Sequence, residues 1–256
     1  MPQGRTMRRL INPFLLLAAT SLIASVQAQD AQQPNFIVIM ADDLGYGDLG
    51  VYGSQLIKTP NLDRMALEGA RLDSFYSSAN VCTAARGGLL TGRYPIRLDL
   101  VSDVARPTNN VHLASEEISL AEALKPLGYK TALFGKWHLG WQESQRPNRR
   151  GFDYFYGMNS RGIFISPDTK GVETWIPGGY DGTRESSTTR PSNDGLITRY
   201  TLSTRDQHPL YKNETPVEDG GYLTETITRE ALGFIERNKS NPFFLYVAHY
   251  APHMPP

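Results

Sequence analysis

The sequence predicts an α/β fold in which a largely parallel, mixed sheet is sandwiched by helices. Short unbroken runs of β-branched and apolar residues are typical of strands buried on both faces of such a sheet. Segments with apolar residues at helical spacing lie between these runs, and the two kinds of segment alternate along the chain. Hydrophobic residues make up 40% of the 256 positions, so the chain can bury a core, which excludes a wholly disordered protein.

Each predicted element has its own local signal. Continuous apolar runs predict strands at residues 35–40, 129–134 and 243–248. Helical spacing and helix-terminating residues predict helices at residues 61–72, 119–124 and 224–237. A further helix that starts near Cys82 is a hypothesis. The stretch of about residues 159–221 is rich in Gly, Pro, Ser and charged residues, which predicts an insertion of loops or short strands beside the substrate pocket.

Residues 1–28 have the pattern of a secretory signal peptide. Arg5, Arg8 and Arg9 precede a short apolar core, and Ala28 ends a small-x-small cleavage site. A retained transmembrane anchor is the alternative, but the apolar stretch is short for a bilayer. We therefore expect an exported protein of residues 29–256 with no membrane span after cleavage. Its destination would be periplasmic or extracellular, or lysosomal in a eukaryote.

The charge balance and the single cysteine exclude two classes of protein. The 26 Lys and Arg residues equal the 26 Asp and Glu residues, and no basic run follows the first ten positions, so nucleic acid is not an expected partner. One cysteine cannot form an intrachain disulfide. In an oxidising compartment a lone thiol is prone to oxidation, so Cys82 calls for an explanation.

Asp42 and Asp43 follow the first predicted strand directly. Ligands of open α/β sheets bind beyond the carboxyl ends of the strands, where two adjacent carboxylates can hold a hard divalent cation. The alternative is an Asx turn that only ends the strand.

Cys82 and Arg86 lie four residues apart, so they share one face if a helix starts near Cys82. The free N–H groups and the dipole at a helix N-terminus favour an anion, and the guanidinium would add a fixed cation. A nucleophile and an anion site would then converge. The alternative for a lone cysteine is a small buried hydrophobe.

Several motifs in order along the chain resemble those of the sulfatase family. The segment from residue 79 reads ANVCTAARGGLLTGRYP, in which a Cys precedes an Arg by four positions and Leu-Leu-Thr-Gly follows. The other matching segments are NFIVIMADDLGYG from residue 35, TPNLD from residue 59, GYKTALFGKWHLG from residue 128 and FFLYVAHYAPHMP from residue 243. Ala84 stands where the commoner form of the cysteine motif has Pro.

This resemblance implies a fold similar to that of sulfatases and alkaline phosphatase, and a calcium-dependent sulfuric ester hydrolase. Cys82 would be oxidised by a maturation enzyme to formylglycine, whose hydrate attacks the sulfur of a sulfate ester. The implied metal ligands are Asp42, Asp43 and residue 82. The implied catalytic residues are Cys82, Arg86, Lys136, His138 and His253.

Lys136 and His138 also stand out by their spacing. They lie two residues apart just past a predicted strand, so in an extended segment both would face the site. The resemblance assigns Lys136 to the sulfate oxygens, His138 to the base that expels sulfate, and His253 to the acid that protonates the leaving oxygen.

The expected substrate is a sulfated small molecule or glycan, that is, a carbohydrate or aryl sulfate. A phosphate or phosphonate ester hydrolase of the same superfamily is one alternative, and a non-catalytic relative that binds sulfated glycans is another. The remaining family ligands lie in a C-terminal half, so residues 29–256 are expected to be an incomplete N-terminal catalytic domain that is inactive alone. Ser160 matches a minor polar site residue only loosely. Surface or core roles are expected for His112, His208 and His249.

Overall fold

A computed structural model describes residues 33–106, 109–159, 172–177, 187–192, 195–200, 210–217 and 222–253. The chain divides into two units, Met1–Gln33 and Pro34–Pro256, and the described helices and strands all belong to the second. The predicted signal peptide, residues 1–28, lies outside the described residues.

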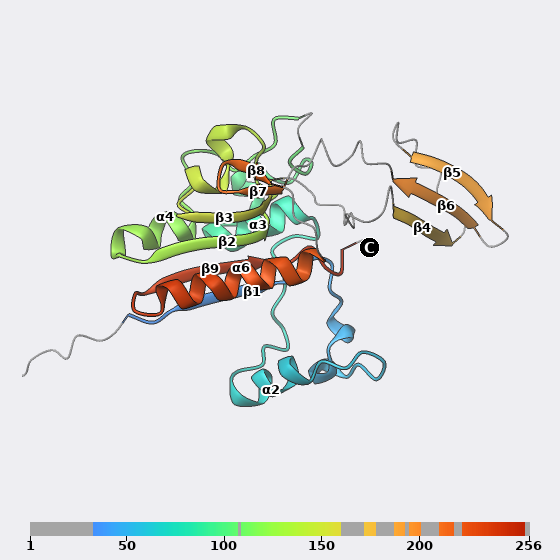
Figure 1. Cartoon of the computed structure of the whole chain (residues 1–256), viewed down its shortest axis with the longest axis horizontal. Coiled ribbons are helices and arrows are strands. Elements are labelled where there is room, and N and C mark those ends of the chain that lie inside the picture. Colours follow the sequence, from blue (N-terminus) through green and yellow to red (C-terminus); the bar gives the residue numbers. More distant parts are fainter. Residues whose placement is uncertain are drawn as a thin grey trace, which may run out of the picture. The chain divides into compact units, whose positions relative to one another are not determined.

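The main sheet is largely parallel (Figure 1). Its strands, in spatial order, are β1 (Phe36–Met40), β9 (Phe243–Ala248), β2 (Lys130–Lys136), β3 (Tyr154–Met158), β7 (Leu210–Lys212) and β8 (Thr215–Val217). The first four are parallel, and β7 and β8 add an antiparallel hairpin. The predicted α/β fold with a mixed, mainly parallel sheet is therefore confirmed.

A second, antiparallel sheet falls within the predicted insertion. Its strands are β4 (Val172–Pro177), β6 (Gly195–Tyr200) and β5 (Ser187–Ser192), with β6 in the centre. The β7–β8 hairpin also falls within the insertion, but it extends the main sheet through β3.

Helices pack on both faces of the main sheet. Helix α6 (Leu223–Asn238) contributes Ile227 and Phe234 to a cluster with Phe243, Leu245 and Val247 of β9. Helix α3 (Cys82–Thr91) and helix α4 (Leu120–Leu124) pack with the alternate residues of β9 on the other face. Every residue of β9 is buried, and its bounds match the sequence prediction, because a strand covered on both faces must be apolar throughout.

Strand β1 differs from its prediction. The sequence predicts a strand buried on both faces, yet Phe36, Ile37 and Ile39 are 43%, 49% and 62% exposed. Within the described residues β1 pairs with β9 on one side and forms the edge of the sheet. The prediction of full burial is wrong because an apolar run records hydrophobicity and not the position of a strand in its sheet.

The remaining helices begin and end at recognisable residues. Helix α2 (Pro60–Glu68) begins with Pro60 and ends before Gly69, earlier than predicted. Ser119 caps α4, because its hydroxyl accepts from the Glu122 N–H at 3.2 Å. Short 3₁₀ helices occupy Tyr46–Asp48, Gly50–Tyr52, Pro95–Leu98, Lys125–Leu127, Glu143–Gln145 and Pro147–Arg149.

The carboxyl end of β2 passes very close to both neighbouring strands. Gly135 has a φ of 112°, and a Cβ atom there would lie 1.9 Å from the carbonyl oxygen of Ala248 in β9. A Cβ on Gly157 of β3 would lie 1.8 Å from the Gly135 carbonyl oxygen. Only glycine fits at these two positions, and the close approach fixes the backbone directly before Lys136.

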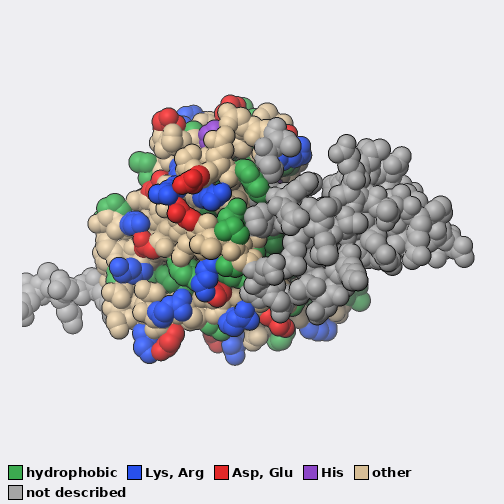
Figure 2. Space-filling model, turned by 45° about the horizontal axis from the view of Figure 1, so that its top comes forward, with side chains coloured by type: hydrophobic (Ala, Val, Ile, Leu, Met, Phe, Trp, Pro, Cys, Tyr) green, Lys and Arg blue, Asp and Glu red, His purple; other side chains and the backbone are tan. Residues whose placement is uncertain are grey.

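On the face drawn in Figure 2, acidic and basic side chains of the described residues are interspersed. Among the described helices, none has both the length and the hydrophobicity needed to cross a bilayer.

Candidate active site

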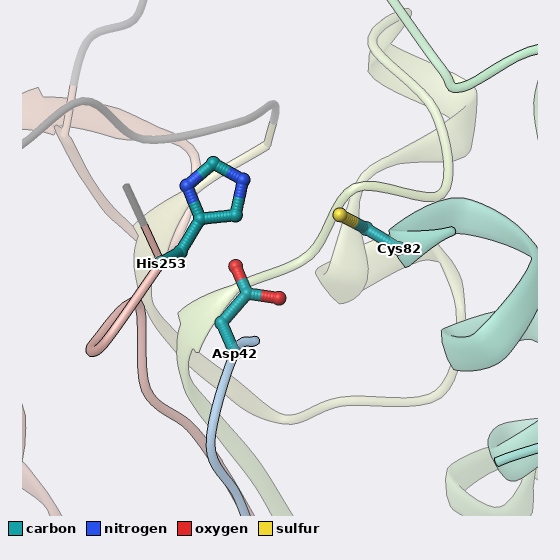
Figure 3. A group of neighbouring side chains, drawn as sticks. All are labelled: Asp42, Cys82 and His253. Carbon is teal, nitrogen blue, oxygen red and sulfur yellow. The ribbon is translucent and has the colours of Figure 1, made fainter. Parts of the chain in front are cut away.

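Three neighbouring strands bring the predicted site residues to one edge of the sheet. Strands β1, β9 and β2 are adjacent and parallel, so their carboxyl ends lie together. Asp42 follows β1, Lys136 ends β2 and His253 follows β9, while Cys82 begins α3. Figure 3 shows the Asp42 carboxylate between the Cys82 sulfur and the His253 ring, and potential ligand atoms of these three residues lie within 4.8 Å of one another.

Asp42 is buried and accepts hydrogen bonds from two cations. Its Oδ1 lies 2.9 Å from Nη2 of Arg86, and its Oδ2 lies 2.6 Å from Nζ of Lys136. Burial alone would raise the pKa of Asp42, but the charges and hydrogen bonds of the two cations outweigh it and lower that pKa overall. The carboxylate therefore stays ionised and holds both cations in place.

Arg86 is a fully buried, fixed cation. It shares a helix with Cys82, which is the first residue of α3, as the hypothesis of a helix at Cys82 requires. Its Nη1 donates to the carbonyl oxygen of Lys136 at 3.0 Å and to the hydroxyl of Tyr246 at 3.3 Å. Burial would lower the pKa of Arg86, but Tyr246 and Asp42 raise it overall, so the positive charge is permanent.

Cys82 is half-buried at the N-terminus of α3 and faces the second cation. Lys136 Nζ donates to its Sγ at 3.4 Å. The first residue of a helix has unpaired N–H groups around it and lies at the positive end of the helix dipole. The surroundings of the sulfur are therefore those of an anion site and not of a core hydrophobe.

Asp43 and His253 form the open side of the site. The Asp43 side chain is 58% exposed, and its Oδ2 lies 3.6 Å from Nε2 of His253. Asp43 adopts a φ of 62°, which turns the chain sharply after β1. Burial, followed by the charge of Lys136, lowers the pKa of His253 below 6.5. The imidazole is therefore mainly neutral at pH 7 when no ligand is bound.

The backbone at His138 differs from the one that its spacing predicts. An extended segment would point Lys136 and His138 to the same side, but His138 has a φ of 59°, in the left-handed region. The expectation of an extended segment is wrong, because the chain turns where β2 ends at Lys136. The side chain of His138 is 2% exposed, and its backbone N–H donates to the Asn159 carbonyl oxygen at 3.0 Å.

Tyr246 is a site residue that sequence reasoning missed. It lies in β9 and is fully buried; its hydroxyl accepts from Arg86 and donates to Met40 Sδ at 3.1 Å. Burial is the main reason that the pKa of Tyr246 is raised. The available signal was the single hydroxyl in an otherwise apolar strand, since a buried Tyr usually has a hydrogen-bond partner.

We expect Tyr246→Phe to lower the free energy of unfolding by about 1–2 kcal/mol, because one bond to the charged Arg86 is lost while the bond to the Lys136 carbonyl remains. Urea denaturation followed by circular dichroism would measure the change. Wild-type stability in the variant would show that the hydroxyl does not support Arg86.

Of the other residues that the sequence analysis singled out, His112 and His249 lie within the described part of the chain. His112 lies near the surface, with Nδ1 2.7 Å from the Asn110 carbonyl oxygen, and His249 is half-buried. Ser160 and His208 lie outside the described residues.

His249 provides a test of pH dependence. Burial lowers the pKa of the His249 imidazole below its usual value of 6.5, so His249 is protonated in the unfolded chain before it is protonated in the folded chain as the pH falls. The stabilising contribution is complete above pH 6.5 and is lost as the pH falls through the folded-state pKa. We expect the free energy of unfolding of the wild type, measured relative to that of His249→Gln in urea titrations, to fall from pH 7.5 to pH 5. A constant difference would contradict this expectation.

Some, but not all, of the potential metal-ligand atoms at this edge of the sheet suit a hard cation. Asp42 and Asp43 offer carboxylate oxygens, and each oxygen of Asp42 has a further lone pair beyond the one that its cation partner uses. The Cys82 sulfur is a soft donor, which fits such a cation only once oxygen replaces sulfur at this position.

The fold and the site together define a class of protein: an α/β protein with a mainly parallel sheet, which places a half-buried cysteine, a buried carboxylate and two buried cations at the carboxyl ends of its strands. The comparisons with known proteins agree. The family model described as Sulfatase matches residues 34–256, and the chain belongs to the sulfatase family.

Two curated relatives and one solved structure illustrate this membership. The chain is 38% identical to arylsulfatase G of Mus musculus over 88% of its own length and 42% of the relative's. It is 34% identical to N-acetylgalactosamine-6-sulfatase of Rattus norvegicus, covering 94% of this chain and 44% of that protein. The crystal structure of Ps i-CgsB matches with a TM-score of 0.68 at 32% identity, covering 88% and 46% of the two chains; the same protein has been crystallised with k-i-k-neocarrahexaose. The chain thus spans somewhat less than half the length of these proteins.

Proposed function

We propose that the protein containing this chain hydrolyses sulfate esters of a carbohydrate or aryl alcohol. The observation that carries the proposal is the meeting of Cys82 with Lys136, Arg86 and Asp42 at the N-terminus of α3, in a chain of the sulfatase family. The net reaction cleaves the ester with water and releases an alcohol and inorganic sulfate. A sulfate ester is an anion, and the two fixed cations would offset the charge that develops on its oxygens.

Position 82 would carry the nucleophile as formylglycine. Formylglycine supplies a hydrated aldehyde, whose hydroxyl oxygens are hard donors and better suited than a thiol to attack sulfur repeatedly. Asp42 and Asp43 would hold Ca²⁺, which supplies additional positive charge next to the sulfate oxygens. The carboxylate pair fits this ion, and oxidation of Cys82 would complete a set of oxygen donors from this chain.

The residues of the chain have separate tasks in this proposal. Lys136 Nζ lies beside both Cys82 and Asp42 and would bind a sulfate oxygen and the nucleophile. Arg86 would stay fixed and stabilise residue 82 electrostatically. His253 lies on the open side of the site, where it could donate a proton to the leaving oxygen once the bound anion favours its protonated form. His138, buried beside α3, would act as the base that returns the nucleophile to its starting state.

Two of the compared proteins favour a sugar as the alcohol. One is called N-acetylgalactosamine-6-sulfatase, and the structure of Ps i-CgsB has been determined with a carbohydrate hexaose. A sulfated glycan or a small sulfated sugar is therefore our proposed substrate class.

Two further proposals concern the export and the maturation of the protein. Residues 1–28 would direct export to the periplasm, the extracellular space or, in a eukaryote, the lysosome, and cleavage would leave a new N-terminus at Gln29. A formylglycine-generating enzyme would act on Cys82. N-terminal sequencing of the exported protein tests the first proposal.

Two measurements on the full-length protein from its native host test the function. Mass spectrometry of the peptide that contains Cys82 should find formylglycine, and an unmodified thiol in every copy would refute the nucleophile. Parallel assays of 4-nitrophenyl sulfate and 4-nitrophenyl phosphate should show preferred release of sulfate. Preferred hydrolysis of the phosphate ester would refute the reaction class.

A further inference from the structure

Thr83 follows the nucleophile position directly, and its side chain is fully buried. Its hydroxyl donates to the carbonyl oxygen of His138 at 2.9 Å and accepts from the N–H of Ala105 at 2.9 Å. Both partners lie outside α3, and Val81, not Thr83, occupies the N-cap of this helix. The hydroxyl therefore joins the start of α3 to two other segments and does not cap the helix.

Of the two partners, His138 has the strained backbone that such a bond can stabilise. Its φ of 59° is costly for a residue with a Cβ atom, so surrounding contacts must hold the backbone in place. From the β3 side, the Asn159 carbonyl oxygen accepts from the His138 N–H at 3.0 Å. From the α3 side, Thr83 binds the His138 carbonyl oxygen, so the peptide groups on both sides of the His138 Cα are fixed.

The two ends of this connection both matter in the proposed reaction. One is the residue beside the nucleophile, and the other is the backbone of the proposed base. We infer that Thr83 is a positioning residue: its hydroxyl bond to the His138 carbonyl fixes the left-handed backbone of His138 relative to residue 82. The inference rests on the proposed function, since it assigns Thr83 a part in that same site.

The test compares Thr83→Val, which keeps the shape but removes the hydroxyl, with Thr83→Ser, which keeps the hydroxyl. Both are made in the full-length protein, and rates are divided by the formylglycine content measured by mass spectrometry. For Thr83→Val on 4-nitrophenyl sulfate we expect kcat to fall by about 10-fold to 100-fold, because small displacements of catalytic groups cost rates of this size. KM should change by less than about threefold, because the binding cations are untouched.

Two further readouts separate positioning from general stability. The pH profile of kcat should shift in Thr83→Val and return in Thr83→Ser, because the environment of His138 changes only in the former. Thr91→Val is the matched control: Thr91 also lies in α3, and its hydroxyl donates to the Gly87 carbonyl oxygen at 2.8 Å, away from His138. This control should leave kcat and the pH profile unchanged.

Several outcomes would overturn the inference. A folded and matured Thr83→Val with wild-type kcat and pH profile would do so, as would equal losses in Thr83→Ser and Thr83→Val or an equal loss in Thr91→Val. If neither Thr83→Val nor Thr83→Ala folds, the role of Thr83 is structural and the inference fails. Wild-type protein without activity on sulfate esters would instead refute the proposed function, and the inference with it.

Discussion

Replacing Asp42 by Asn is expected to lower the free energy of unfolding by about 3–5 kcal/mol, the usual cost of removing one member of a buried ionic group. Asn has nearly the same shape, but Arg86 and Lys136 would then be buried without the negative charge that both of them contact. Burial already works against the charge of Arg86, so its remaining partners, Tyr246 and a backbone carbonyl, would not replace the carboxylate. Chemical denaturation of the full-length protein measures the loss, and catalytic activity should disappear with it.

Asp43→Asn is the matched control for this variant. The two aspartates are neighbours in the sequence, but the Asp43 side chain is largely exposed and lies near His253. Asn also tolerates the φ of 62° at this position. We expect a stability change below about 1 kcal/mol, as for most exposed substitutions. Equal destabilisation by the two changes would contradict the assignment of Asp42 as the central anion of the site.

Cys82→Ala is expected to abolish activity but, unlike Asp42→Asn, to keep the stability of the protein. Removal of a catalytic nucleophile should lower kcat for a sulfate ester by at least ~10³-fold. The sulfur, however, has one hydrogen bond of 3.4 Å to Lys136, and Ala is a good residue within a helix. The free energy of unfolding should therefore change by less than about 1 kcal/mol.

Steady-state kinetics and denaturation of the same Cys82→Ala preparation give both numbers. Substantial residual activity would refute residue 82 as the nucleophile. A large loss of stability would instead show that the sulfur is a core atom, the alternative that the sequence leaves open for a lone cysteine.

Much of the fold could be predicted because its signals are local. The bounds of β9 follow from an unbroken apolar run, and the hypothesis of a helix that starts near Cys82 agrees with the first residue of α3. The burial of β1 could not be predicted, because an edge strand and a central strand of a parallel sheet can have the same apolar sequence. Whether such a sequence becomes an edge strand or a central strand depends on neighbouring strands that come from distant parts of the chain.

The site likewise contains residues that the sequence could identify and residues that it could not. Family resemblance pointed to the charged residues that the structure brings together, including Arg86 and Lys136, while their proposed roles stay predictions. It did not identify Tyr246 and Thr83, whose partners Arg86 and His138 lie 160 and 55 positions away in the sequence. Nor did spacing reveal the left-handed turn at His138, because alternation along a strand applies only while the strand continues.

The central place of β9 also has a consequence for the order in which the chain folds. It lies between β1 and β2 and pairs Phe36 with Phe244, so two strands made early in synthesis are joined by one made about 200 residues after the first. Until β9 leaves the ribosome, β1 and β2 have no partner between them, and Asp42 and Lys136 are not yet held together. We expect nascent chains that stop before Phe243 to lack the protease resistance of chains that include Ala248, because β9 supplies the backbone pairing that joins β1 to β2.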